Sequence, residues 1–322
     1  MNFLTTYNNY RLDMGLKILL HDQLGHNIYL LDETWKGKIN YDFAVSKNQR
    51  GLQWLLHEDG INTISHQEVM ETDKIDAVLI TAVEHQEDII KEIYTEKFDT
   101  VKYIVYWGND ITWYQSGMLY FDWFKNHIAI NEPSYLDAKR NGCNAVMSRI
   151  PTDNRIFKPF HIQKELTVNS YIHYYKKYWK NSYNIFKKMS EEFPNIKFVS
   201  NGFEEDKVLI SPLDVAEAMN SSLATAHIKE KEGYGHTVIE SMSCGIPVIA
   251  PRALIRGKIM ENWVTNDTAI IFDNINDFRD RFNKYLLGDN VAMSKKAIEV
   301  INREINVEEQ ASKMKKFLEE LI

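Results

Sequence analysis

The sequence is poor in cysteine and in long apolar runs, and each shortage excludes a class of protein. Cys143 and Cys244 are its two cysteines, so a disulfide framework and a zinc site are both unsupported. No stretch of about 18 consecutive apolar residues occurs, which indicates that the chain does not span a membrane. The first fifteen residues have neither a charged region nor a long apolar core, so we expect no secretion signal.

Positive charge is also scarce. The chain has 38 Lys and Arg against 45 Asp and Glu, a formal net charge of -7 at pH 7. It therefore lacks the global positive field that nucleic-acid-binding proteins commonly carry, although a local patch could still bind nucleic acid. Its 322 residues are enough for one large or two medium domains, each with its own core.

Short apolar runs alternate with helical patterns from the first residue, which favours an α/β fold with parallel strands. The predicted strands of the first half are 2–7, 27–31, 77–81, 103–107 and 127–131, and the predicted helices are 12–24, 85–97 and 134–141. Beyond a central break the alternation restarts. The predicted strands there are 168–173 and 196–200, and the predicted helices are 182–193, 214–220, 277–287 and 307–321.

The break is the segment 149–159, RIPTDNRIFKP, which has proline near both ends and no periodicity. Such a segment is typical of an interdomain crossover. The predicted architecture is two doubly wound, Rossmann-like domains that face each other across a cleft. We predict an N-terminal domain at 1–150, a crossover at 151–163, a C-terminal domain at 164–302, and a helix at 303–322 that is a candidate to pack back on the N-terminal domain.

The most informative segment is EGYGHTVIESMSCGIPVIA, residues 232–250, in which Glu232 and Glu240 stand either side of a Gly-Tyr-Gly turn. Its pattern predicts strand, loop, helix and strand, with the helix beginning at His236 and Thr237 and closed by Gly245. The free N–H groups of such a helix start attract an anion such as a diphosphate. The two carboxylates can accept hydrogen bonds from the hydroxyls of a sugar and a ribose.

This segment resembles the donor site of the GT-B nucleotide-sugar glycosyltransferases, in particular the retaining group called family 4, or glycosyl transferases group 1. Three shorter segments also resemble that family. They are 8–15 after the first strand, LGHNIYLL at 24–31, and the crossover SRIPTDNRIFKP at 148–159. The resemblance implies two Rossmann-like domains facing a cleft, with Asn9 and Gly15 of the first loop on the donor side.

By this resemblance Glu232 contacts the donor sugar and Glu240 the ribose. Backbone amides of residues 234–237 meet the diphosphate, because Gly233 and Gly235 permit a close approach of the backbone. A simpler interpretation of the two glutamates is a capping carboxylate and a helix-surface carboxylate. Tyr234 is equally interpreted as a packing aromatic. His236 either donates to a phosphate or merely begins the helix.

A diphosphate leaving group needs cations, because negative charge grows on it as the glycosidic bond breaks. The family supplies an Arg and a Lys after the first strand of its C-terminal domain, and the equivalent segment here is SYIHYYKKYWKNSY, residues 170–183. Lys180 matches the family's Lys. The Arg is absent: His173 is nearest by position, and Lys176 or Lys177 are candidates to replace it. An aromatic, basic loop that binds a lipid surface or nucleic acid is the alternative.

On the N-terminal side, WGND at 107–110 resembles the family's H-G-x-D turn. Trp107 occupies the position of the family's His, so a histidine contact with the sugar is not carried over. Asp110 matches, and either orients hydroxyls or is a turn aspartate. Residues 113–124 hold six aromatics that pack in a core, stack on a sugar or base, or lie at a membrane interface. Arg256 and Lys258 lie where the family often has two glycines near the donor.

The resemblance thus implies a retaining transfer from a nucleoside diphosphate sugar, UDP being the expected nucleotide, to a hydroxyl acceptor. We expect a glycan or lipid-linked saccharide as acceptor, neither metal nor cofactor, no obligate protein partner, and a cytoplasmic enzyme with peripheral membrane contact left open. One alternative is a viral-type enzyme that glycosylates hydroxymethylated DNA bases in an infected host cell. The other is a non-catalytic module that binds a nucleotide sugar or a membrane surface.

Overall fold

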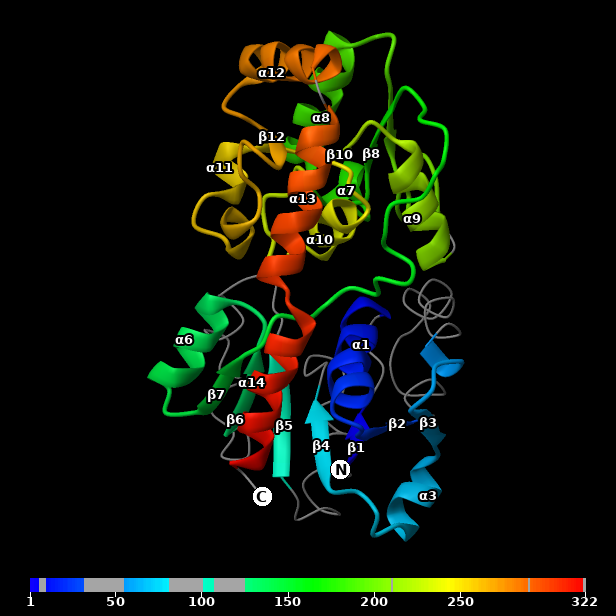
Figure 1. Cartoon of the computed structure of the whole chain (residues 1–322), viewed down its shortest axis with the longest axis vertical. Coiled ribbons are helices and arrows are strands. Elements are labelled where there is room, and N and C mark those ends of the chain that lie inside the picture. The colour runs from blue at the N-terminus through cyan, green and yellow to red at the C-terminus, as the bar shows by residue number, and fades with distance from the viewer. Residues whose placement is uncertain are drawn as a thin grey trace. The chain divides into compact units, whose positions relative to one another are not determined.

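The computed structural model describes residues 1–5, 10–31, 55–80, 101–106, 125–209, 211–288 and 290–320. The chain divides into two compact units, Met1–Pro151 with Val307–Ile322, and Thr152–Asn306. Each unit is built of helices on one sheet (Figure 1). Every strand pair in both sheets is parallel. The prediction of an α/β chain with two Rossmann-like, doubly wound halves is therefore confirmed.

The sheet of the first unit has the strand order β3-β2-β1-β4-β5-β6-β7. The strands are β1 (Asn2–Thr5), β2 (Asn27–Leu31), β3 (Ile61–Ile64), β4 (Ala77–Ile80), β5 (Val101–Tyr106), β6 (Asn126–Ala129) and β7 (Asn144–Met147). The strand order reverses between β1 and β4, and open α/β sheets bind ligands beyond the carboxyl ends of strands at such a point. Asn9, in the loop that follows β1, lies outside the described residues.

Helix α1 (Tyr10–Lys17) follows that loop and continues as a π-helix, η1 (Ile18–Gln23). Gly15 is buried within α1, against the end of the first unit's main segment. A Cβ atom on Gly15 would overlap the side chain of Ile150 and lie 2.7 Å from the carbonyl oxygen of Pro151. A close helix contact thus explains why this position is glycine.

The other described helices of the first unit are α3 (His66–Glu71), α6 (Glu132–Arg140) and α14 (Val307–Glu319). The last helix of the chain, α14, packs against η1 and β7, and Figure 1 shows it lying along the sheet of the first unit. Gln310 of α14 is buried, and its Oε1 accepts a hydrogen bond from the backbone N–H of Arg149 at 2.9 Å. The chain therefore returns to its first unit after completing the second.

The second unit contains a five-stranded sheet of order β12-β11-β10-β8-β9. The strands are β8 (Thr167–Ser170), β9 (Lys197–Ser200), β10 (Ala224–Ala226), β11 (Val248–Pro251) and β12 (Ala269–Phe272). The helices are α7 (Tyr175–Tyr178), α8 (Lys180–Glu192), α9 (Pro212–Ser221), α10 (His236–Ser243), α11 (Arg252–Ile255), the 3-10 helix η6 (Ile259–Asn262), α12 (Ile275–Leu287) and α13 (Asn290–Glu304).

The helices of the second unit cover both faces of its sheet. On one face, α8 and α12 bury an aromatic core that includes Phe186, Phe278 and Phe282. On the other face α10 packs against α9 and α13, and Ser241 of α10 donates a hydrogen bond to Thr225 Oγ1 of β10 at 2.8 Å. The central strands are buried on both faces, as parallel sheets require.

Several elements differ from the prediction. Strands β3, β7 and β12 and helices α3 and α13 were not predicted, and the predicted helix 12–24 is divided into α1 and η1. The predicted helix 85–97 lies outside the described residues. No helix in the described segments has the length and apolarity needed to cross a membrane.

Candidate donor site

The glutamate segment folds as a strand, loop, helix and strand, formed by β10, residues 227–235, α10 and β11. Gly235 immediately precedes α10 with φ 81°, a left-handed conformation that favours glycine. A Cβ atom there would lie 2.6 Å from Met260 Sδ. Gly245, with φ 71°, follows the helix end. The two glycines therefore allow the chain to enter and leave α10 sharply, with the first-turn amides at the carboxyl end of β10.

Glu232 lies in the loop before α10, and its side chain is only 10% exposed. Its Oε2 lies 3.2 Å from Lys229 Nζ and 3.3 Å from His227 Nε2, while its Oε1 accepts a hydrogen bond from the N–H of Gly233 at 3.1 Å. Burial alone would raise the pKa of this carboxyl, but the Lys229 charge and the His227 contact outweigh burial and hold the pKa well below its usual range. Glu232 is therefore a buried, ionised carboxylate.

Glu240 lies in the second turn of α10 and is fully buried. The alternative interpretation of Glu240 as a helix-surface carboxylate is therefore wrong. Burial raises the pKa of the Cys244 thiol to about 12, and the nearby charge of Glu240 contributes to that shift. Burial likewise raises the pKa of Tyr171 well above its usual value, again with a contribution from Glu240. The glutamate side chain thus points into the unit, close to the end of β8.

Tyr234 and His236 flank Gly235. Tyr234 is 2% exposed and packs edge-on against the rings of His236 and Trp263, at centroid distances of 4.9 and 6.0 Å. This burial fits a packing role for the tyrosine side chain, which leaves its backbone as the part able to meet a ligand. His236 is the first residue of α10, beside Thr237.

The lysines of the predicted cationic segment, residues 170–183, have different surroundings. Lys176 Nζ lies 2.6 Å from Asp206 Oδ1 and 3.8 Å from Glu205 Oε2. Lys177 Nζ lies 3.8 Å from Glu204 Oε2 and stacks over the Tyr178 ring at 5.1 Å. These two lysines therefore tie the loop after β8 to the acidic loop after β9.

His173 belongs to the same connection between loops. Its Nδ1 accepts a hydrogen bond from the N–H of Phe203 at 3.1 Å, and the two rings stack with centroids 4.4 Å apart. Lys180 differs, because it is the first residue of α8, its side chain is exposed, and within the described segments it has no acidic partner. Lys180 is thus a free cation at a helix N-terminus.

Two functional candidates were missed by the sequence reasoning, His227 and Lys229. Both follow the end of β10 and both contact Glu232. Lys229 Nζ also lies 5.6 Å from the centroid of the Trp179 ring. Sequence position could have identified Lys229. It lies three residues before Glu232 and soon after a buried strand, so both residues are on the same short loop.

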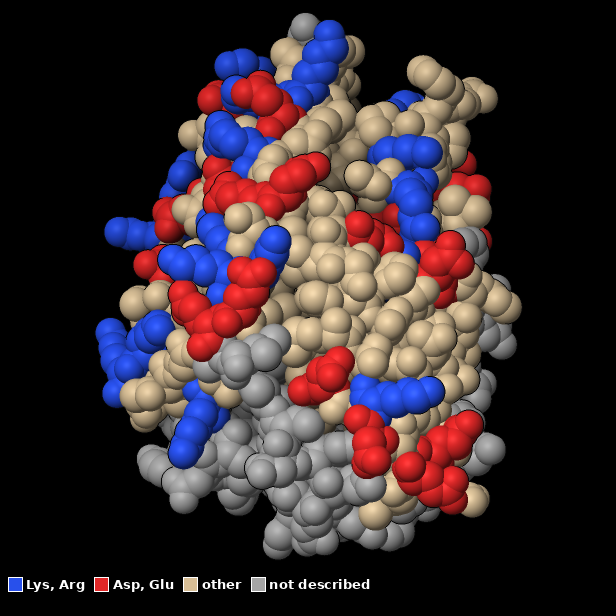
Figure 2. Space-filling view, turned by 60° about the horizontal axis from the view of Figure 1, so that its bottom comes forward, with Lys and Arg blue, Asp and Glu red and all other residues tan. Residues whose placement is uncertain are grey.

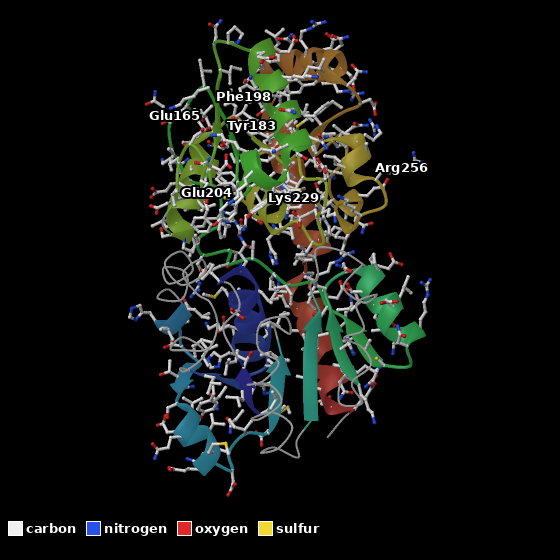
Figure 3. The ribbon with its side chains drawn as sticks, turned by 180° about the vertical axis from the view of Figure 1, so that it is seen from behind. Glu165, Tyr183, Phe198, Glu204, Lys229 and Arg256 are labelled. Atoms are coloured by element: carbon white, nitrogen blue, oxygen red, sulfur yellow. The ribbon has the colours of Figure 1, made fainter. Side chains whose placement is uncertain are left out.

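Three hydrogen bonds hold the loop from Ile228 to Gly235 in place. Tyr175 donates its hydroxyl to the Ile228 carbonyl at 2.9 Å, and Ser182 Oγ donates to Glu230 Oε1 at 3.3 Å. Lys258 Nζ donates to the Glu230 carbonyl at 2.9 Å. Arg256, by contrast, is exposed, and Figure 3 shows it at the outer side of this unit, away from Lys229. Of the Arg256 and Lys258 pair, Lys258 therefore contacts the loop.

Comparison with known proteins agrees with this arrangement. Residues 207–304, which include both glutamates and α10, match the family glycosyl transferases group 1. Among curated proteins no sequence matches. Among solved structures, HepE from Anabaena in complex with UDP is similar over 99% of both chains, at a TM-score of 0.68 and 12% identity. The likeness to this structure shows that the chain has the GT-B fold.

Two further solved structures are similar to this chain. Sucrose-phosphate synthase from Thermosynechococcus elongatus is similar over 100% of this chain and 99% of its own, with a TM-score of 0.67 and 11% identity. TarM from S. aureus, in a complex that contains UDP, is 17% identical with a TM-score of 0.59. This chain spans about half of TarM: the similarity covers 74% of this chain and 55% of TarM.

The remaining predicted site residues of this chain are not described. Asn9, Asp110, the turn 107–110 and the aromatic segment 113–124 all lie outside the described residues. In the described segments, no group of three or more His, Cys, Asp or Glu side chains is placed to hold a metal ion. The described site is therefore the half that belongs to the second unit.

Proposed function

We propose that the protein transfers a sugar from a nucleoside diphosphate sugar, most simply a UDP-sugar, to a hydroxyl of a glycan or lipid-linked saccharide with retention of anomeric configuration. The observation that carries this proposal is the placement of two carboxylates around Gly235: Glu232, 10% exposed, in the loop before it, and the buried Glu240 in the helix after it. The structure of HepE with UDP-glucose, on the same fold, supports the choice of donor.

The diphosphate is expected at the start of α10, where the first-turn amides attract negative charge. Lys180 opposes the charge that grows on the β-phosphate as the bond to the sugar breaks. Glu232 accepts hydrogen bonds from Lys229 and Gly233, but a carboxylate offers about four lone-pair sites, so Oε1 retains room for a sugar hydroxyl. Glu240 is assigned to the ribose.

The reaction that follows is a displacement on one face of the sugar. The bond from the anomeric carbon to the β-phosphate oxygen breaks, the acceptor oxygen bonds to that carbon, and the acceptor proton passes to the departing phosphate. Glu232 is a poor candidate for the nucleophile of a double displacement, because its lone pairs are held by a lysine and its pKa is lowered. The departing phosphate is therefore assigned as the base.

Surface charge bears on the choice between a glycan acceptor and modified DNA. On the face in Figure 2, the coloured Lys and Arg side chains stand among Asp and Glu side chains instead of forming one basic field. DNA binding depends on a cluster of cations that replaces the counterions of many phosphates. The described part of this face therefore gives no support to DNA as the acceptor.

A donor screen with product analysis tests the proposal. The protein is incubated with UDP-, GDP-, ADP- and dTDP-sugars and a panel of glycan and lipid-linked acceptors, and nucleoside diphosphate release is measured. The proton NMR coupling of the anomeric position then gives the configuration of the product. We expect a UDP-sugar to be consumed with retention. Inversion would refute the one-face displacement, and a protein that binds donors but never turns over would be a binding module.

A further inference from the structure

In residues 170–183, the proposed phosphate-binding half of the site retains one of the two cations that the family resemblance implies. A diphosphate that leaves with growing charge is stabilised by more than one cation in a site that excludes water. Lys180 is a described candidate, and the family's arginine has no counterpart in residues 170–183. A second cation must therefore come from elsewhere in the unit.

The nearest candidates by sequence are already engaged. Lys176 bonds Asp206 at 2.6 Å, and this hydrogen bond is the main cause that raises the pKa of Lys176. Lys177 faces Glu204 across an exposed surface. Both lysines belong to α7, and in the described segments both pair with acidic side chains of the loop after β9 instead of the loop that leads into α10. Both lysines therefore belong to a loop connection.

Lys229, which lies shortly after β10, is close to the start of α8. Its ammonium lies over the ring of Trp179, 5.6 Å from the centroid, and Trp179 is the residue directly before Lys180. The cation–π contact thus brings Lys229 to the N-terminus of α8, next to the position of the family's matched lysine. Lys229 also bonds Glu232 on the loop that leads into α10. Its side chain is 19% exposed, so it is partly open to solvent.

The ammonium of Lys229 has donors to spare. An ammonium group has three N–H donors, and in the described part of the chain Lys229 uses one of them on Glu232 while its remaining contact is a ring face. Binding an anion therefore does not require the ion pair with Glu232 to break. We propose that Lys229 is the second cation of the diphosphate site, a role that rests on the proposed function. Trp179 acts as its positioning residue.

Nucleotide binding by calorimetry tests this assignment. The probe is whichever of UDP, GDP, ADP and dTDP binds wild type most tightly, together with the matching nucleoside, which lacks phosphate. Lys229→Met is expected to weaken the diphosphate about tenfold or more, because it removes a charge-assisted contact, while nucleoside affinity changes less than about twofold. Lys229→Arg should retain most of the affinity. Lys176→Met and Lys177→Met are matched controls expected to change diphosphate affinity less than about twofold.

The variant Glu232→Gln shows whether Lys229 contacts the diphosphate or only forms a structural ion pair with Glu232. It breaks the same pair from the carboxylate side but leaves the ammonium, so the proposal predicts unchanged or tighter diphosphate binding. A structural pair predicts equal losses in Glu232→Gln and Lys229→Met, for nucleoside and diphosphate alike, and that outcome overturns the proposal. If Lys229→Met does not fold, Lys229→Gln carries the same comparison. If wild type binds none of the four diphosphates, the proposed function fails as well.

Discussion

Glu232 Oε2 lies 3.3 Å from Nε2 of His227, the residue that directly follows β10. The contact joins the end of a central strand to the loop that leads into α10. Lys229 completes the same cluster at 3.2 Å. A single carboxylate therefore links the side chains that precede α10, the helix at which we propose that the donor binds.

The first prediction concerns pH. Because folding lowers the pKa of Glu232 below its ordinary value of 4.5, the ionised carboxylate contributes stability that is fully present above about pH 4.5 and is lost as the pH falls. We expect the difference in unfolding free energy between wild type and Glu232→Gln to be about 1–3 kcal/mol at pH 7 and to shrink toward pH 3. Urea unfolding followed by circular dichroism across this range measures it.

Glu191→Gln is the control for the pH series, because this carboxylate is 62% exposed and makes only an exposed pair with Lys187 on the same helix. Its unfolding free energy should stay within about 0.5 kcal/mol of wild type at every pH. A difference between wild type and Glu232→Gln that does not vary with pH would contradict the lowered pKa.

The second prediction concerns the helix entrance. Gly235→Ala must place a Cβ atom in a left-handed backbone and within 2.6 Å of Met260 Sδ. Gly257 has a similar φ of 71° but open space around its Cβ position. Gly257→Ala is therefore expected to cost about 1 kcal/mol from backbone strain alone, and Gly235→Ala more, with weaker nucleoside diphosphate binding. Urea unfolding and calorimetry compare the two variants, and equal costs would refute the predicted clash.

The third prediction separates two lysines of α8. Lys180 begins the helix, whereas Lys188 is exposed two turns later, remote from the helix N-terminus. Lys180→Met should lower the rate of sugar transfer about tenfold or more if its charge stabilises the leaving phosphate. Lys188→Met should leave the rate within about twofold. Initial rates of sugar transfer are measured with saturating donor. Similar rates in the two variants would contradict the assignment of Lys180 to the site.

The fold was predicted well where the sequence pattern is local and strongly apolar. The strand at Asn27–Leu31 was predicted with its observed bounds, and the start of α10 follows from glycines that allow a sharp turn. Strand β3 was missed because its residues, INTI, include two exposed polar side chains and give no apolar run. The change from α1 to η1 has no signature in residue type, because it depends on how the helix packs.

The site shows the same division between local and tertiary information. Glu232, Glu240 and the glycines between them were identified from spacing in one short segment. Lys229 was missed because its contact with Trp179, which precedes α8, exists only after β10 and α8 come together. Lys176 was a candidate by proximity in sequence, but its partner Asp206 lies thirty residues away and is brought to it by the neighbouring strand β9.

The most direct test of the central claim compares the rate of sugar transfer from the preferred donor in wild type, Glu232→Gln and Glu191→Gln. The account predicts that Glu232→Gln lowers the rate about a hundredfold, because the hydrogen bonds of a buried carboxylate at the donor sugar are lost, and that Glu191→Gln stays within about twofold. A Glu232→Gln enzyme that folds and transfers sugar at the wild-type rate would contradict the placement of the donor at this loop.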